Sequence, residues 1–170
     1  MGIIIISLGC KVHKDLYTAW NSNCHIEGER LPMFSTYLSK DSTNGYSIWD
    51  YVKDWQNFDN GQYTDTTLIS QVSIEIQDES SLKLTQIRAN KEIDTFTLYG
   101  RFENENFVSL QKHKKILIPL IYYQNLNEQL VFKLNNEKNL IIQGLMWNEG
   151  AFLFMIGNDG GTSQNTYKKI

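Results

Sequence analysis

Two cysteines and three histidines are the residues of this sequence best suited to bind a metal or form a covalent bond. In an oxidising compartment, Cys10 and Cys24 could close a short loop through a disulfide. His25 directly follows Cys24, but no second Cys or His pair lies at ligand spacing, and a zinc site needs at least three converging protein ligands. We therefore predict no metal site and no cofactor.

The sequence lacks the motifs that mark common enzyme classes. It has no Gly-x-Ser-x-Gly elbow, no Gly-Lys-Ser/Thr phosphate loop and no His-Glu-x-x-His helix. Residues 157–162 are rich in glycine, but a phosphate cradle would require a following helix whose N-terminus faces the anion. We expect a protein without enzymatic activity. Because catalytic partners are assembled in space, an enzyme of unknown class stays open as an alternative.

The first ten residues resemble the end of a bacterial lipoprotein signal peptide. Residues 3–6 are all isoleucine, the small residue Gly9 directly precedes Cys10, and the chain turns polar from Lys11 onward. In lipoproteins a peptidase cuts before an acylated cysteine. The resemblance therefore implies lipidation at Cys10, which would leave Cys24 as a lone thiol.

The same apolar run has a second interpretation. Four consecutive isoleucines have strong strand propensity, so residues 2–8 could instead be the first strand of a cytoplasmic protein. The lipoprotein resemblance places the protein in the cell envelope, anchored to the membrane by lipid and facing the periplasm or the cell surface. The alternative location is the cytoplasm.

Composition indicates one domain and argues against a nucleic-acid partner. The 170 residues, of which 41% are hydrophobic and 12% aromatic, can fill a single core. The formal net charge of −3 does not suit a duplex, whose binding depends largely on Lys and Arg that neutralise phosphates. The basic cluster at 112–115 is expected to be a solvated turn between two strands. Its functional alternative is a patch that meets an anionic surface.

Short segments of alternating apolar and polar residues recur between residues 68 and 157. In the first, Val72 and Ile74 fall on one face and Glu75 on the other, which is the pattern of a half-buried strand. About eight strands are expected, over residues 67–77, 82–87, 93–102, 107–111, 116–123, 129–134, 139–146 and 151–156. Their regular spacing predicts an antiparallel meander, followed by a polar tail at 159–170.

Residues 11–66 are expected to join the meander in one domain and to contain one short helix. Apolar side chains recur there at nearly helical spacing, at Ile48, Trp49, Tyr51, Val52 and Trp55. They predict an amphipathic helix near 47–58 that begins close to Ser47. This aromatic stripe is expected to pack on the core. Its alternative role is to line a ligand pocket, because Trp and Tyr combine a large apolar area with a polar group.

An open sheet of eight strands would have two long edges with unpaired backbone groups, and closure into a barrel removes both. We therefore expect an all-β fold with one short helix, in which the meander closes into a barrel. The aromatic helix around residues 47–52, followed by a meander in which residues 72–76 lead into 99–102, resembles small uncharacterised cell-envelope lipoproteins of Gram-negative bacteria with lipocalin-like barrels.

The interior of a barrel of this size is filled by side chains or holds one small ligand. Candidate lining residues are the large apolar side chains on the inward faces of the strands, namely Val72, Ile74, Leu84, Phe96, Leu98, Phe132, Ile142 and Phe154. The expected function is that of a non-enzymatic envelope lipoprotein acting as a binding or assembly module, with a small apolar ligand or a protein as its partner. The alternative is a lipocalin-like carrier of a small apolar ligand.

Overall fold

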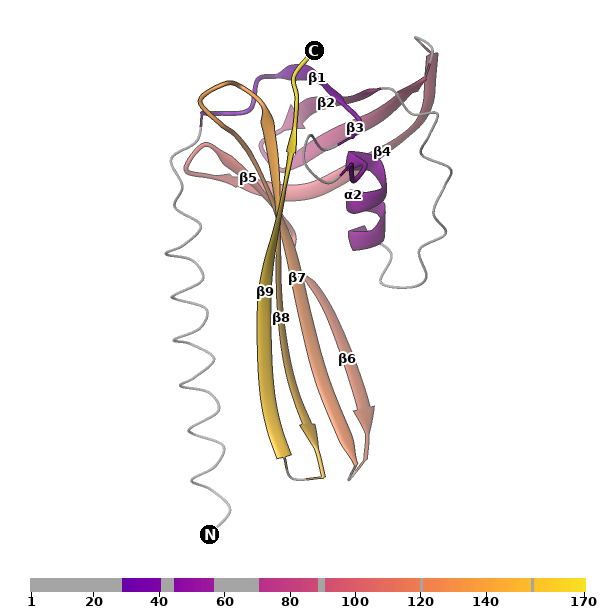
Figure 1. The fold of residues 1–170 in the computed structure, drawn as a ribbon, viewed down its shortest axis with the longest axis vertical. Coiled ribbons are helices and arrows are strands. Elements are labelled where there is room, and N and C mark those ends of the chain that lie inside the picture. Colours follow the sequence, from indigo (N-terminus) through magenta and orange to yellow (C-terminus); the bar gives the residue numbers. More distant parts are fainter. Residues whose placement is uncertain (1–28, 41–44, 57–70, 89–90, 120, 154) are drawn as a thin grey trace.

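The computed structural model describes residues 29–40, 45–56, 71–88, 91–119, 121–153 and 155–170, and within them nine strands form one antiparallel sheet (Figure 1). One short helix packs against this sheet. The predicted all-β class with a single short helix is confirmed.

The first half of the sheet follows chain order. Its strands are β1 (Phe34–Leu38), β2 (Gln71–Asp78), β3 (Ser81–Arg88), β4 (Lys91–Glu103) and β5 (Asn106–Ser109). Each is antiparallel to the next. β4 pairs with β3 through residues 91–99 and with β5 through residues 100–103, so this one long strand joins two parts of the sheet.

The second half of the sheet is built from longer strands. They are β6 (Lys112–Ile118), β7 (Tyr122–Leu134), β8 (Leu140–Phe152) and β9 (Met155–Tyr167). β5 pairs with the inner end of β7, and β6 pairs with its outer end. The outer parts of these strands project from the body of the molecule (Figure 1). We call this projection, comprising β6 with residues 122–128, 146–152 and 155–161, the blade.

Strand positions were predicted well in the first half and poorly in the second. The segments expected at 82–87, 93–102 and 107–111 correspond to β3, β4 and β5. Residues 112–115, 124–128 and 148–150 fall between the expected strands, and this prediction was wrong, because they lie inside β6, β7 and β8. Most of the expected polar tail lies in β9. Polar residues that resemble turns occupy the middle of these long strands, and two of them in β7, Asn125 and Asn127, are buried.

The sheet does not close into a barrel, contrary to the expectation from sequence. In the part of the chain that the structure describes, no ladder joins β1 to β9. Instead, the residues after β9 touch β1 at one bridge, between Tyr37 and Lys169. The Leu38 amide donates to the Lys168 carbonyl at 2.9 Å, and the Ile170 amide donates to the Thr36 carbonyl at 3.1 Å. β1 has five residues and β9 has thirteen, so β1 could cover only part of the free edge of β9.

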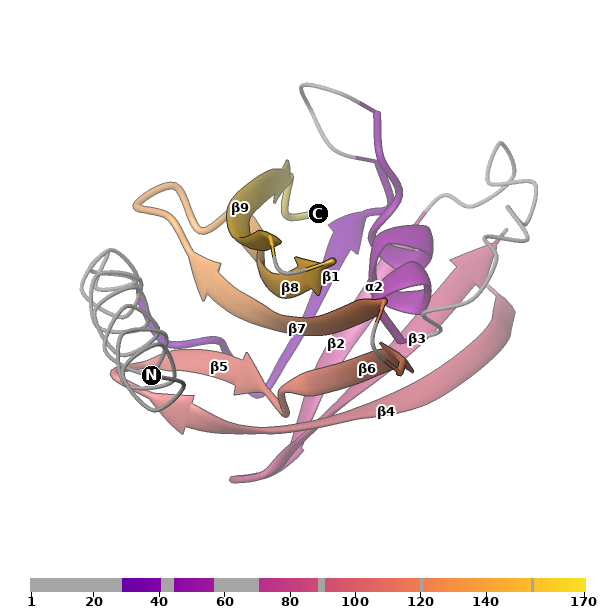
Figure 2. The same cartoon turned by 90° about the horizontal axis from the view of Figure 1, so that it is seen from below.

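The helix α2 (Ile48–Gln56) begins where the sequence predicts. The Ser47 hydroxyl caps its N-terminus by accepting hydrogen bonds from the amides of Trp49 at 3.1 Å and Asp50 at 3.4 Å. Trp49 is buried and packs edge-to-face on Phe96, with ring centroids 4.9 Å apart. Figure 2 shows α2 on the inner side of the curved sheet, where its apolar face completes the core. No helix among the described residues combines the length and apolarity that crossing a bilayer requires.

Candidate functional site

A pocket of about 630 Å³ lies between α2 and the middle of β7, β8 and β9. We call it the α2 pocket. Its lining consists of three aromatic side chains, several polar groups and a few apolar residues, namely Tyr46, Tyr51, Trp55, Glu128, Leu130, Gly144, Leu145, Met146, Gly161, Thr162, Ser163, Gln164 and Asn165. Its volume falls within the range of about 300–1,000 Å³ that is usual for small-molecule sites.

Glycine at position 144 leaves room for Tyr51 of α2 to reach β9 across the sheet. Leu130, Gly144 and Ser163 are paired across β7, β8 and β9, so they share the inner face. A Cβ atom at Gly144 would collide with the Tyr51 hydroxyl and lie 2.7 Å from the Ser163 Oγ. With glycine there, the Tyr51 and Ser163 hydroxyl groups share a hydrogen bond of 2.5 Å. This bond ties the helix to β9 at the wall of the pocket.

Two groups of opposite charge lie beside the pocket. Lys112 and Glu128 are cross-strand partners in β6 and β7, and the Lys112 ammonium lies 4.8 Å from the centroid of the Trp55 ring. Burial raises the pKa of Glu128, and the charge of Lys112 opposes this shift. Burial likewise lowers the pKa of Lys112 against the charge of Glu128. For both groups, the loss of water therefore outweighs their mutual attraction.

The hydroxyl pair is better suited to binding than to nucleophilic attack. Burial raises the pKa of Tyr51 although Ser163 and the Gly144 backbone form hydrogen bonds with it, and the charge of Glu128 raises it further. Tyr51 therefore stays protonated at neutral pH. A serine nucleophile needs a neighbouring base that accepts its proton, and a protonated tyrosine cannot serve as one.

One polar group in the wall of the pocket has no hydrogen-bond partner. The Trp55 Nε1 atom is buried and finds no acceptor among the described residues. A buried donor without a partner costs about 1–3 kcal/mol, which an incoming acceptor would recover. The pocket thus offers aromatic faces, a carboxyl group and an unsatisfied N–H donor to a ligand.

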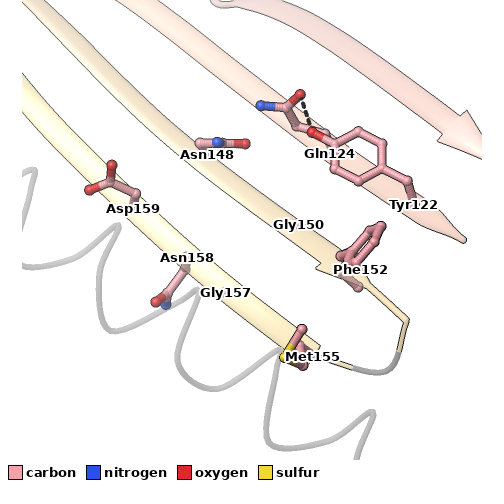
Figure 3. A pocket seen from close by; sticks show the side chains of 10 residues that line it. Tyr122, Gln124, Asn148, Gly150, Phe152, Met155, Gly157, Asn158 and Asp159 are labelled. Atoms are coloured by element: carbon pink, nitrogen blue, oxygen red, sulfur yellow. Dashed lines mark hydrogen bonds between the residues drawn. The ribbon is translucent and has the colours of Figure 1, made fainter.

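A second hollow of about 320 Å³ lies on the same inner face, at the outer end of the blade (Figure 3). Tyr122, Phe152 and Met155 gather at its outer end, whereas Asn148 and Asp159 lie further in. The Tyr122 hydroxyl donates to the Gln124 Oε1 at 2.7 Å. This hollow is a shallow surface beside an apolar edge.

The residues proposed from sequence as ligand lining lie mostly in the core. Six of them are buried there, namely Val72, Ile74, Leu84, Leu98, Phe132 and Ile142. Phe96 is half-buried and packs against this core. None of these seven residues lines the α2 pocket. Cys10, Cys24 and Phe154 lie outside the described residues. Within the described ranges, no group of three His, Cys, Asp or Glu side chains could hold a metal ion.

The sequence pattern predicts the helical side of the pocket but not its strand side. The aromatic stripe includes Tyr51 and Trp55, whereas Lys112 and Glu128 fall between expected strands and Ser163 falls in the expected tail. A signal was available for Glu128: the period of two that places Phe132 on the inner face also places Glu128 there. The polar residues around Glu128 masked that alternation.

The chemistry of the α2 pocket is the principal guide to its role. No family model matches the chain, and neither a curated protein nor a solved structure matches it.

Proposed function

We propose that this protein is a non-enzymatic cell-envelope lipoprotein, held to the membrane through acylated Cys10, that acts as a binding module through the α2 pocket. The observation that carries the binding role is the pocket itself, an open hollow with aromatic walls and an unsatisfied donor on Trp55. The anchoring role rests on the sequence pattern that ends at Cys10.

The lining of the pocket indicates the kind of ligand. Tyr46, Tyr51 and Trp55 provide flat surfaces for a ring or an alkyl chain, and Trp55 can donate to an acceptor on the ligand. The Glu128 carboxyl group adds a polar position to this lining, and burial raises its pKa against the opposing charge of Lys112. We therefore expect a small neutral ligand, or a side chain of a protein partner, with an apolar part and at least one acceptor.

Binding is tested on protein purified from its native membranes. Native mass spectrometry should detect a bound small molecule, or a bound protein, on the wild type. Trp55→Phe keeps a ring and removes the donor, so occupancy should fall about threefold to tenfold, as expected for one hydrogen bond. Trp147→Phe is the matched control, because Trp147 belongs to the opposite face of β8. Absence of any bound partner, or equal occupancy in both variants, would contradict the proposal.

Anchoring is tested by the intact mass of the protein from the same membranes. The mature chain should begin at an acylated Cys10, because the apolar run at 3–6 is far short of the about 20 residues that span a bilayer. Cys10→Ser should abolish processing, whereas Cys24→Ser should leave it unchanged. A wild-type chain that retains Met1 and lacks acyl groups would refute the lipoprotein assignment.

A carrier of a small apolar ligand is the second candidate. Leu130 and Met146 add apolar area to the aromatic walls of the pocket, and this observation favours such a cargo. The same mass spectrum separates the two functions. A lipid or hydrocarbon as the only bound species would favour the carrier, and a bound protein would favour the assembly module.

A further inference from the structure

The outer end of the blade is apolar and exposed. Among the described residues, sixteen large apolar side chains are exposed, and eight of them lie in residues 116–121 and 152–156. The most exposed of the eight are Leu117 at 70%, Met155 at 68% and Ile156 at 73%. We call residues 116–119, 121–123, 151–153, 155 and 156 the blade tip. Concentrated exposed apolar surface of this kind usually marks a contact with a protein or a membrane.

The pairing of the four strands arranges the tip in rows. The first row, on the inner face, contains Ile118, Tyr122, Phe152 and Met155. The second row, on the outer face, contains Leu117, Tyr123, Ala151 and Ile156. Two rows further from the end, the residues are Lys115, Asn125, Glu149 and Asn158. The blade therefore changes from apolar to polar within a few residues of its turns.

We propose that the blade tip inserts into the surface of a lipid bilayer. Apolar side chains cover both faces of the tip, so a protein partner would need a socket that encloses a thin projecting edge. Lipid surrounds an inserted edge without such a preformed shape. This inference stands apart from the α2 pocket and from acylation of Cys10, because it rests on neither.

The depth of the apolar part matches shallow insertion. Successive rows in an antiparallel sheet are about 3.4 Å apart, so the turns and the first two rows span about 7–10 Å. Segments that lie in a membrane interface bury their apolar side by about 5–10 Å. Tyr123 lies in the second row, next to the polar part of the blade, where tyrosine is favoured because its ring is apolar and its hydroxyl is polar. The Tyr122 hydroxyl donates to Gln124, which lies further from the tip.

Two backbone hydrogen bonds join the turns of the tip, whereas the outer edges of β6 and β9 have no partner strand among the described residues, so the tip suits the hydrated interface of a bilayer rather than its hydrocarbon core. The Ile121 amide donates to the Ile118 carbonyl at 3.1 Å, which closes the turn between β6 and β7. The Leu153 amide donates to the Ile121 carbonyl at 3.0 Å, which joins the two turns of the tip. The two turns can therefore enter lipid together as one rigid edge.

The charges behind the tip give little preference for anionic lipid. The polar row nearest the apolar part contains one positive and one negative residue, Lys115 and Glu149. The next row adds Lys114 and Asp159. Because the signs balance, we expect attachment to come from apolar burial and to depend only weakly on salt.

The experiment uses the full 170-residue chain carrying Cys10→Ser, so that no acyl group contributes to binding. Flotation with phosphatidylcholine vesicles measures partitioning, and the tip variant combines Leu117→Gln with Ile156→Gln. The control variant combines Leu110→Gln with Ile170→Gln, two side chains that are exposed by 57% and 58% and lie beyond the ends of β6 and β9 opposite to the tip. Partitioning of the tip variant should be at least tenfold weaker, which corresponds to about 1.4 kcal/mol. The control variant should match the unaltered chain.

Circular dichroism and the unfolding midpoint of the tip variant should match those of the control, which excludes misfolding as the cause. No partitioning to neutral vesicles, or equal partitioning of the two variants, would overturn the proposal. Attachment only to vesicles with anionic lipid, abolished by salt, would also overturn it and assign the contact to the basic residues of β6. A dimer detected by sedimentation velocity and lost in the tip variant would identify a second copy as the partner instead.

Discussion

Two phenylalanines lie on the same face of the sheet, one buried in the core and one exposed on the blade. Replacing each of them with alanine compares the stability that the core position and the blade position contribute. Phe132 in β7 is fully buried, and Phe152 in β8 is 47% exposed at the blade tip. Both lie on the inner face according to the strand pairing. The chemical change Phe→Ala is identical at both positions, so any difference in stability reports their surroundings.

The expected losses follow from burial. Phe132 packs edge-to-face on Phe107, with ring centroids 6.2 Å apart, and Phe107 is also fully buried. Phe132→Ala removes the buried ring and this aromatic pair, so it should destabilise the fold by about 3–5 kcal/mol. Phe152 retains about half of its exposure to water, so Phe152→Ala should cost about 1 kcal/mol or less.

Thermal and urea unfolding measure the difference. In a chain of this length, each kcal/mol lowers the midpoint by about 2–4 °C, so Phe132→Ala should shift it by about 6–20 °C. In urea, the midpoint should fall while the slope stays constant. Equal losses at the two positions, or a loss below about 1 kcal/mol at Phe132, would refute the assignment of the inner face. Lys133 is unsuitable as a neutral control. It points to the outer face as the alternation predicts, but it is buried, and its Nζ donates to the Gln143 Oε1 at 3.3 Å.

Two further predictions concern the α2 pocket. Gly144→Ala should destabilise the fold by about 1–3 kcal/mol, because the added Cβ displaces Tyr51. Gly161→Ala is the control: an added Cβ there meets no atom within 4 Å, so stability should change by no more than about ±0.5 kcal/mol. Equal urea midpoints for the two variants would refute the role of Gly144. Burial raises the pKa of Glu128 in the folded state above its ordinary value of 4.5. The stability that Glu128 contributes to the fold is therefore complete below pH 4.5 and is lost as the pH rises through the pKa of the folded state. Glu128→Gln, which stays neutral, should therefore gain stability relative to the wild type as pH rises from 4.5 toward neutrality, and a constant difference across unfolding curves would contradict the shift.

Sequence predicts correctly those segments in which the apolar side chains are buried and the polar side chains are exposed. The helix is one example, since its apolar stripe and its Ser47 cap both point to the observed start. β3 is another, because Leu82 and Leu84 alternate with polar residues and are fully buried. In such segments the alternation of apolar and polar side chains indicates which face packs on the core.

The blade could not be predicted in this way because its burial does not follow its apolar residues: its apolar tip is exposed, whereas Asn125 and Asn127 are buried. The segment from Gln124 to Glu128 has the composition of a turn, yet it continues β7, held by backbone pairing to β6 and β8. The turns fall in apolar sequence after Ile118 and Phe152, where a core strand would be expected. Ser163 could not be predicted because the first ten residues of β9 are exposed, so its position depends on the register of β9 alone. Openness of the sheet could not be inferred either, because it depends on unequal strand lengths.

The contact between β1 and the residues after β9 has a consequence for the order of folding. Nearly every other ladder joins strands that are neighbours in the chain, so most pairing can form locally, whereas the Tyr37–Lys169 bridge spans almost the whole chain. Loop-closure entropy makes such a distant contact late to form, and only two backbone hydrogen bonds accompany it. This seam should therefore open first in the native state. Its amides at Leu38 and Ile170 should exchange with deuterium well before those of β3, whose backbone is paired on both sides.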